Sequence, residues 1–340
     1  MLIPIISVII VNYNGFGLLK ECLDSLRGQT FRDFEIILVD NASSDGSVEL
    51  VEERYPEVSL IKNRKNYGYG IGNNRGIAAA KGKYIVLLNN DANADPHFLE
   101  ALIKTAGNNN RVGMFAPKIL NYFNRDIIDS AGLIMYRDGI ARGRGRLEKD
   151  RGQYNNIEEV IFPSGCACLY SREMLNDIGS FDEDLFLYLD DVDMGLRARI
   201  AGWKCKYVPN AIVYHKYSAT TKPYSALKGF MVERNRIWIM IKYFPISMIV
   251  LSPFFTIIRY AHYIYGIWMR KGIGIKVARS EPVYKIVWVI IKAYFSAFKG
   301  VRNMLKKRNE MIKLKRVSND EITEWFRRFG LGVKEVSLKE

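Results

Sequence analysis

The sequence is poor in the residues that crosslink secreted proteins or build zinc sites. Its 340 residues include four cysteines and three histidines. No two cysteines form a Cys-x-x-Cys pair, and the spacing of Cys166 and Cys168 is not typical of a zinc site. These shortages exclude a disulfide-stabilised scaffold and indicate reduced, mostly buried thiols in a cytosolic protein.

The N-terminus also lacks the features of a secretory signal. Residues 1–6 have no basic segment, and no small-residue cleavage site follows them. We expect these residues to lead into the first strand of the fold. The chain is therefore predicted to stay on the cytoplasmic side.

No uninterrupted apolar run reaches the roughly 20 residues that a membrane-spanning helix needs. Tyr243–Ile258 is a stretch of sixteen uncharged residues, but Pro245 and Pro253 break it. Pro282–Phe298 mixes apolar and aromatic residues with two lysines, as an interfacial helix does. Peripheral membrane attachment is the favoured prediction, with a re-entrant or spanning segment and a soluble helical cap as alternatives.

Acidic residues are scarce in the C-terminal third. Residues 221–340 contain 24 lysines and arginines against 8 acidic residues, whereas residues 1–220 contain 26 and 28. The basic third includes the aromatic-rich run Ile237–Met269. Basic and apolar character together favour an anionic membrane surface over nucleic acid as a partner. We expect residues 236–340 to form a helical region at the cytoplasmic face of the membrane, with a soluble cytoplasmic protein as the alternative.

The first hundred residues alternate between strand and helix patterns. Continuous apolar strands separated by helices predict an α/β fold, in which a parallel sheet is covered on both faces. The expected strands are Ile5–Asn12, Phe34–Asp40, Val58–Ile61 and Tyr84–Asn89, and the expected helices are Phe16–Arg27, Ser47–Arg54 and Ile71–Ala80.

Polar residues close three of these strands. They form Asn12-Tyr13-Asn14, the segment from Asp40 to Gly46, and Asn89-Asn90-Asp91. Ligands of such sheets bind at the carboxyl ends of the strands, so these clusters predict one site. A carboxylate at the end of a buried strand suits a Mg²⁺ ion that bridges two phosphates. An ordinary turn is the alternative interpretation of Asp91.

The pattern loosens after residue 110. Arg137–Arg151 is basic and rich in glycine, which predicts a mobile loop that is either a solvated turn or a contact for a phosphate-bearing acceptor. Ser164–Tyr170 reads as a buried strand, Phe181–Arg199 as an acidic loop leading into a helix, and Trp203–His215 as a strand pair. Arg234-Asn235-Arg236 could reach phosphates or lie on a surface helix.

Four segments in this order resemble the inverting family-two glycosyltransferases of GT-A fold, and most closely their rhamnosyltransferase-like branch. The segments are Ser7–Asn14, Leu38–Ser47, Asn66–Gly76 and Leu87–Asp91. The resemblance covers roughly residues 5–240. It implies a GT-A catalytic domain over residues 1–235, with a mostly parallel central sheet and helices on both faces. It also implies a nucleotide-sugar donor, Mg²⁺ or Mn²⁺, and transfer with inversion at the anomeric carbon.

The resemblance further implies a set of donor-binding residues. Asn12 and Tyr13 would line the base and ribose, and Asp40 would meet the uracil or thymine edge. A carboxylate that accepts from an imide N–H keeps a buried acceptor paired. The other members of the implied set are Asn14, Asn41, Asn66, Gly70, Asn73, Asn89 and Asn90, of which Asn73 lies at a helix start near the pyrophosphate.

The metal motif departs from the Asp-x-Asp pattern of the family. Asn89 replaces the first carboxylate, so only Asp91 is charged. His215 matches a family histidine that helps to hold the metal or the pyrophosphate. With one carboxylate in the motif, the donor's own phosphates would have to complete the metal site.

The resemblance assigns the catalytic base to Asp191, with Asp190 in place of the family's glutamate. Adjacent carboxylates should raise each other's proton affinity, which suits a base that deprotonates an acceptor hydroxyl. Stabilisation of the following helix by these acids is the alternative. Gly165, Cys166 and Asp193 are the implied acceptor residues.

The predicted function is metal-dependent inverting transfer from a dTDP- or UDP-sugar, with rhamnose as one candidate, to a hydroxyl of a lipid-linked or cell-envelope glycan. A sugar-nucleotide-binding protein without transfer activity and a nucleotidyltransferase of similar fold are the alternatives. Gly68-x-Gly70-x-Gly72 invites comparison with dinucleotide oxidoreductases. However, these glycines follow the third strand and not the first, so we disfavour that class.

Overall fold

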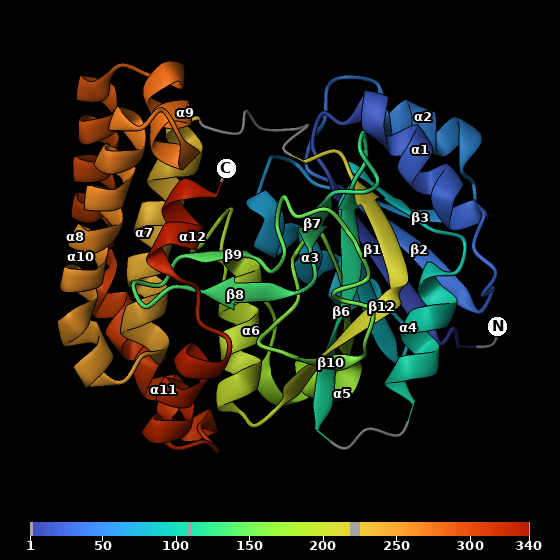
Figure 1. Cartoon of the computed structure of the whole chain (residues 1–340). Helices are drawn as coiled ribbons and strands as arrows, with labels where there is room; N and C mark the ends of the chain where they lie inside the picture. The colour runs from blue at the N-terminus through green and yellow to red at the C-terminus, as the bar shows by residue number, and fades with distance from the viewer. Residues whose placement is uncertain (1–2, 108–110, 218–224, 340) are drawn as a thin grey trace. The chain divides into compact units, whose positions relative to one another are not determined.

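The computed structural model describes residues 3–107, 111–217 and 225–339, and it divides into two compact units (Figure 1). The sheet unit comprises Met1–Leu133, Gly143–Ala198 and Trp203–Thr220. The helical unit comprises Ile134–Arg142, Arg199–Gly202 and Thr221–Glu340. The sequence-based division at residues 235 and 236 falls within helix α7 (Ala226–Tyr243).

The first four strands of the sheet unit are parallel, as predicted. They lie in the order β3-β2-β1-β4, and helices connect them in the alternating pattern expected from the sequence. The strands are β1 (Ile6–Asn12), β2 (Phe34–Asp40), β3 (Val58–Lys62) and β4 (Tyr84–Leu88), and the helices are α1 (Phe16–Arg27), α2 (Ser47–Arg54) and α3 (Gly68–Ala79).

The rest of the sheet is mixed. β11 (Ala167–Ser171) lies antiparallel between β4 and β6 (Val112–Asn121), and β12 (Lys204–His215) runs parallel to β6. β12 is one long strand with a register shift between Val208 and Ile212, where the sequence suggested a pair of strands. The remaining strands at this end are β5 (Ala92–Ala94), β7 (Ile128–Ser130) and β10 (Glu158–Val160).

Helices cover both faces of the sheet. Ile6, Val8 and Ile10 of β1 belong to a buried cluster that also holds residues of α1, α2 and α4 (Phe98–Ala106). The alternate β1 residues face α3 across two glycines, because a Cβ atom at Gly72 or Gly76 would lie 2.7 Å from Val11 or 2.5 Å from Ile9. Close packing of α3 on β1 thus accounts for Gly72 without a dinucleotide.

The helical unit contains the long helices α7, α8 (Ile246–Trp268) and α10 (Val283–Leu314), drawn in gold to orange in Figure 1. Shorter helices complete it: α9 (Gly272–Ser280), α11 (Asn319–Arg328) and α12 (Val333–Leu338). The turn of the hairpin formed by β8 (Leu133–Met135) and β9 (Ala141–Gly143) also groups with it. Within the described residues, none of the helices combines the length and the hydropathy needed to cross a bilayer.

Helix α8 continues through Pro253, so the predicted break at this proline is wrong. Proline has no N–H to donate to the carbonyl four residues earlier. Here the hydroxyl of Ser252 donates to that carbonyl, Ile249 O, at 2.8 Å. The side chain restores the acceptor's partner, and the helix is not interrupted.

Two predictions about arginines are also corrected. Arg236 neither lies on the surface nor is placed to bind phosphate, because it is 1% exposed and bonded to Glu233. The glycine-rich Arg137–Arg151 segment contains β9, and three of its arginines, Arg142, Arg144 and Arg146, have protein partners. Arg142 donates to the carbonyls of Glu335 and Lys339 at 2.6 and 2.5 Å. The segment is therefore not a solvated turn.

Candidate active site

Polar side chains at or just after the ends of β1, β2 and β4 are joined by hydrogen bonds. Asn12 and Asp40 are partners in the strand register, and Asn12 Nδ2 donates to Asp40 Oδ1 at 3.0 Å. The backbone N–H and the hydroxyl of Ser43 donate to the Asp40 carboxylate at 2.8 and 2.6 Å. Asn90 Nδ2 donates to Asn12 Oδ1 at 2.8 Å. The polar residues that close β1, β2 and β4 are thus brought together, as the sequence predicted.

The loops that follow β1 and β2 are strained and partly exposed. Asn14 and Ala42 have φ angles of 49° and 63°, in the left-handed region that residues with a Cβ atom rarely adopt. Such strain persists where the surrounding contacts impose it, and it is common at binding sites. Tyr13, which lies in the loop after β1, is 41% exposed. Its ring is accessible at the sheet edge, where the sequence places the base and ribose.

Two of the predicted donor residues, Asn41 and Asn73, are buried and have protein partners. Asn41 is buried and donates to Gly68 O at 3.1 Å while accepting from Asn63 at 2.7 Å. Asn73 is buried and donates to Tyr69 O at 3.0 Å. Both amides therefore have structural roles in this chain.

Asn66 and Gly70 flank the start of α3. Asn66 accepts from the N–H of Gly68, which has φ +84° and leaves no room for a Cβ atom beside Phe186 O. At Gly70, an added Cβ atom would lie 3.3 Å from Asp190 Oδ1. The donor loop and the carboxylate pair are thus direct neighbours.

Strand pairing brings Asp91 and His215 together. His215, the last residue of β12, pairs with Ala92, the first residue of β5. The residue before Ala92 is Asp91, and its Oδ1 lies 3.4 Å from His215 Nε2. Both side chains are nearly buried. Two residues that are far apart in sequence thereby form a carboxylate–imidazole pair at the predicted metal position.

Asp129, which the sequence did not predict as a site residue, holds the other side of the imidazole. Asp129 Oδ2 lies 2.6 Å from His215 Nδ1, and Asp129 Oδ1 accepts from Arg146 at 2.6 Å. Asp129 lies in the three-residue strand β7, which has no motif that would mark it. Only the pairing of β6 with both β7 and β12 reveals the contact.

The electrostatics of His215 follow from these contacts. Burial opposes the charged form, but Cys166 and the carboxylates of Asp129 and Asp91 raise the pKa of His215 well above its ordinary value. These neighbours therefore favour the protonated imidazole, and a cation bound at Nε2 would take the place of its proton. Asp129 orients the ring towards Asp91.

The donor set at this position suits a hard divalent cation in part. Asp91 and His215 supply one carboxylate and one imidazole, and Mg²⁺ commonly takes one or two protein ligands together with substrate phosphates. No cluster of three or more His, Cys, Asp or Glu ligands occurs in the part of the chain that the structure describes. The residues therefore fit a metal site that the donor's phosphates complete.

Asp190 and Asp191 begin helix α6 (Asp190–Ile200), and their environments differ. Asp191 is partly exposed and accepts from Gly165 N at 2.8 Å and from Val192 N at 2.9 Å. Asp190 is 3% exposed. Burial raises the pKa of Asp191 although those two N–H groups oppose it. Burial and the carboxylates of Asp191 and Asp193 raise the pKa of Asp190 well above its ordinary value.

The segment Gly165-Cys166 connects the carboxylate pair to the metal position. Gly165 N–H holds Asp191, and Gly165 O accepts from the hydroxyl of Tyr69 at 2.7 Å. Cys166 is buried, its carbonyl accepts from Asn89 N at 2.8 Å, and its thiol interacts with His215. The predicted donor, metal and base residues are therefore linked through direct neighbours at one edge of the sheet.

Two further features distinguish the residues around Asp191. Phe186, Tyr188 and Leu189 have φ angles of 65°, 68° and 63°, so strained backbone immediately precedes the carboxylate pair. Asp193, a predicted acceptor residue, is 1% exposed and pairs with Arg197 at 2.6 Å. That buried ion pair within α6 accounts for Asp193 without an acceptor.

Known glycosyltransferases are similar to this chain in sequence. The family model for glycosyl transferase family 2 matches residues 7–179. An N-acetylglucosaminyl-diphospho-decaprenol L-rhamnosyltransferase of Mycobacterium tuberculosis is 29% identical over 271 residues, which are 69% of this chain and 86% of the relative. A putative glycosyltransferase of Bacillus subtilis, EpsH, is 35% identical over 106 residues, 31% of each chain.

Solved structures of glycosyltransferases share the fold. The mannosyltransferase PcManGT from Pyrobaculum calidifontis, solved with GDP-Man and Mn²⁺, has a TM-score of 0.51 at 17% identity over 92% of this chain and 86% of its own. GalNAc-T7, solved with UDP, GalNAc and Mn²⁺, has a TM-score of 0.58 at 17% identity over 71% of this chain and 48% of its own. The sheet unit therefore has the GT-A fold. Because the family model spans more than half of the sequence, the chain belongs to glycosyl transferase family 2 and is a glycosyltransferase.

Proposed function

We propose that the chain transfers a sugar from a dTDP- or UDP-sugar to a hydroxyl of a lipid-linked or cell-envelope glycan, with inversion at the anomeric carbon. The observation that carries the proposal is the position of Asp191. Its partly exposed carboxylate is fixed by Gly165 N–H, next to the segment that contacts both Asn89 and His215. A base fixed beside the predicted diphosphate site is the geometry that a single displacement needs.

The donor is held by the strand ends in this proposal. Asp40 accepts from the imide N–H of uracil or thymine, with Asn12 and Asn90 keeping its carboxylate in place through their own contacts. The exposed ring of Tyr13 stacks against the base. Asn14, Asn66 and Asn89 lie along the rest of the donor.

Asp91 and His215 would hold Mg²⁺ or Mn²⁺ together with the donor's phosphates. The cation would supply neutralisation of the negative charge that develops on the leaving diphosphate. Asp129 keeps the imidazole in the orientation in which Nε2 faces Asp91. Deprotonation of the acceptor hydroxyl is the role of Asp191, a carboxylate of the chain itself.

Asp191 removes the proton from the acceptor hydroxyl, whose oxygen forms the new bond to the anomeric carbon. The bond from that carbon to the nucleotide diphosphate breaks, and the diphosphate leaves on the opposite face. A pKa raised by burial suits this role, because the carboxylate is a stronger base than an exposed aspartate. Asp190 is the more buried member of the pair, and it packs against Gly70 in the first turn of α3.

The lipid-linked acceptor is proposed from the relative whose name states a diphospho-decaprenol acceptor. Rhamnose is the candidate sugar on the same ground. An acceptor of this kind places the reaction at a membrane surface, and we propose the cytoplasmic face of that membrane.

A thermal-shift screen tests donor and metal together. The purified chain is heated with UDP-, dTDP- and GDP-sugars, each with and without Mn²⁺. One uracil or thymine donor should stabilise the protein with Mn²⁺, by about 2.7 kcal/mol at a hundred times its Kd. An equal shift without metal would contradict the metal requirement, and no shift with any donor would contradict the donor class. NMR of the product's anomeric centre then tests inversion.

A further inference from the structure

Helix α8 buries polar side chains and exposes apolar ones, which is the reverse of a helix that faces water. The side chains it buries include Ser252, Thr256 and Arg259. Its exposed positions recur at helical spacing and are apolar, with Val250 71% and Trp268 77% exposed. A helix on a water-soluble domain shows the opposite pattern. We call the exposed row the α8 stripe, which consists of Ile246, Val250, Phe254, Ile257, Ile264 and Trp268.

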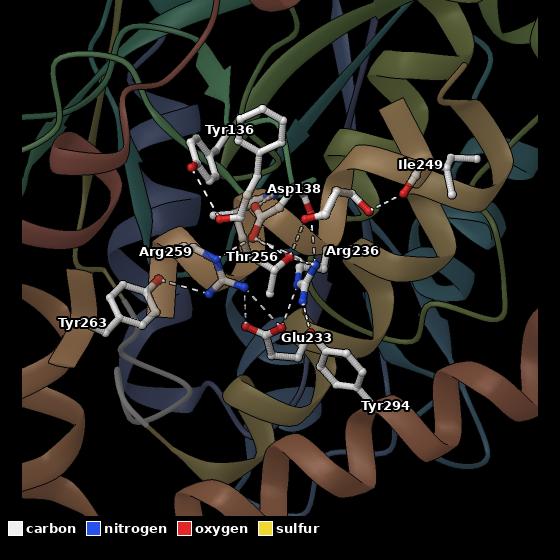
Figure 2. Close-up of polar contacts among 12 residues, drawn as sticks. Tyr136, Asp138, Glu233, Arg236, Ile249, Thr256, Arg259, Tyr263 and Tyr294 are labelled. Atoms are coloured by element: carbon white, nitrogen blue, oxygen red, sulfur yellow. Dashed lines mark hydrogen bonds and ion pairs between the residues drawn. The ribbon is translucent and has the colours of Figure 1, made fainter. Parts of the chain in front are cut away.

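The polar residues that α8 buries are satisfied inside the helical unit. Figure 2 shows Arg259 and Arg236 between Glu233 and Asp138, which we call the buried quartet. Arg259 Nε lies 2.6 Å from Asp138 Oδ2, and Arg236 Nε lies 2.6 Å from Glu233 Oε2. Two positive and two negative charges balance. The apolar outer row is therefore not a consequence of a poorly packed helix.

Helix α10 exposes a second apolar row. Its inner side is lined by small or flexible residues, Ala293, Ala297, Gly300 and Met304, and Gly300 lies against the ring of Trp238 on α7. Its outer side carries large side chains at intervals of three and four residues. This α10 stripe consists of Tyr284, Trp288, Ile291, Phe295 and Phe298.

Lysines recur every seven residues beside the α10 stripe. This lysine row consists of Lys285, Lys292, Lys299, Lys306 and Lys313, and all five side chains are exposed. The ammonium groups of Lys292 and Lys299 lie 5.3 and 4.5 Å from the ring centroids of Trp288 and Phe295. A seven-residue repeat keeps side chains on nearly the same side of a helix. Long cationic side chains that flank aromatic residues match an interfacial helix.

We propose that the α8 stripe and the α10 stripe dock the enzyme on an anionic lipid bilayer, with the lysine row at the headgroups. The inference deepens the proposed function, since a lipid-linked acceptor would lie in the same bilayer.

Charge complementarity selects a bilayer over a second copy of the chain. Helix α8 contains no acidic residue, and the acidic residue of α10 is Glu310, near its C-terminal end. Lys285 pairs with Glu281, whereas Lys292 and Lys299 have no acidic residue within four positions on their own helix. Two copies that met through α10 would bring like charges together, which is unfavourable. Phospholipid headgroups supply the missing negative charge.

Vesicle flotation of the full chain, without donor, tests the surface. We expect binding to phosphatidylcholine vesicles that contain phosphatidylglycerol, weaker binding to phosphatidylcholine alone, and loss of the difference at high salt. Replacing Lys292, Lys299 and Lys306 by Gln should weaken binding to the anionic vesicles by about fivefold per lysine and leave the neutral vesicles unaffected. Trp288→Ser with Phe295→Ser and Phe298→Ser should weaken binding to both.

A matched control removes exposed apolar side chains from the sheet unit. Ile3→Ser with Ile157→Ser, at positions 75% and 56% exposed, should leave vesicle binding unchanged. Donor-induced thermal shifts without vesicles report separately on folding and on the proposed function, so either idea can fail alone. Equal binding of all variants would overturn the docking surface. A dimer in solution that the aromatic substitutions dissociate, with no vesicle binding, would also overturn it.

Discussion

The two units of the chain place polar and apolar residues in opposite ways. In the sheet unit, β1 and β4 are buried apolar strands, and polar groups gather where the strands end. In the helical unit, charged residues such as Arg236 and Arg259 are 1% exposed while Trp268 and Phe298 are 77% and 75% exposed. The sheet unit follows the usual order for water, whereas the helical unit reverses it on α8.

The contrast teaches that burial of charge is acceptable when the charges are balanced, and that exposed apolar rows mark a surface with a partner. In the sheet unit, buried or half-buried carboxylates lie at the proposed active site, at strand ends and at the start of α6. In the helical unit, the buried carboxylates of the quartet form ion pairs with arginines of α7 and α8. The following predictions test whether each unit uses its carboxylates in the way described.

The largest expected effect belongs to the proposed base. Asp191→Asn should lower the transfer rate by about 10²–10⁴-fold, because an amide cannot take the hydroxyl proton. Donor affinity should stay within experimental error, since Asp191 contacts backbone groups of Gly165 and Val192. A steady-state transfer assay with calorimetric donor titration measures both. Glu183→Gln, on the exposed part of the preceding loop, is the control. Retained turnover in Asp191→Asn would refute the base assignment.

The buried quartet should control the stability of the helical unit. Asp138→Ala leaves Arg259 buried without its nearest carboxylate and should cost about 3–5 kcal/mol in urea unfolding. Burial opposes ionisation of Glu233, but Arg259 and Arg236 lower its pKa to about 2. Its contribution is therefore present above the pKa of an unfolded glutamate and is lost as the pH falls towards 2. Glu324→Gln, in an exposed pair with Arg327, should change neither quantity. A loss below about 1 kcal/mol in Asp138→Ala would contradict a structural role of this size.

Asp129 should act through His215. Asp129→Ala should weaken Mn²⁺-dependent donor binding by about 10–100-fold, the effect typical of residues that orient a metal ligand. Donor binding without Mn²⁺ should not change. Arg146→Gln removes the ion pair on the other oxygen of Asp129 and is the matched control. Equal losses in the two variants, or a loss that persists without Mn²⁺, would indicate a purely structural role.

The smallest expected effect is a gain in folding stability when Asp190 is replaced by asparagine. Its raised pKa means that the unfolded chain ionises first, so the folded state loses stability as the pH rises above the ordinary aspartate range. The slope is about 1.4 kcal/mol per pH unit at most. Asp190→Asn should therefore unfold at a higher temperature than the parent at neutral pH. The two proteins should converge below about pH 4, and a constant difference across this range would contradict the pKa shift.

The local pattern of the sequence was sufficient for the first half of the sheet unit. Phe16–Arg27, Phe34–Asp40 and Ser47–Arg54 were predicted with the bounds that the structure has. Their apolar spacing is set within each element, so no distant contact is needed to read it. The prediction that polar strand ends meet was confirmed for Asn12, Asp40 and Asn90, because parallel strands end at one edge.

Contacts between segments that are far apart in the sequence could not be predicted from such local patterns. Asp129 lies 86 residues from His215, and its strand is three residues long. Continuity of α8 depends on the Ser252 hydroxyl, which a rule about proline does not include. The resemblance to a known family predicted His215 and Asp191 as site residues. It did not predict that Asp129 orients His215 or that the backbone N–H of Gly165 holds Asp191.

The seven-residue interval of the lysine row has a consequence for how the proposed attachment to a bilayer could be adjusted. Successive lysines are about 10.5 Å apart along α10, which is longer than the Debye length of about 8 Å at physiological salt. Each charge then acts nearly independently of the next. Neutralising one lysine, for example by acetylation, would reduce residence on the bilayer by one step rather than abolish it. Binding would then change in graded steps with the number of charged lysines on α10.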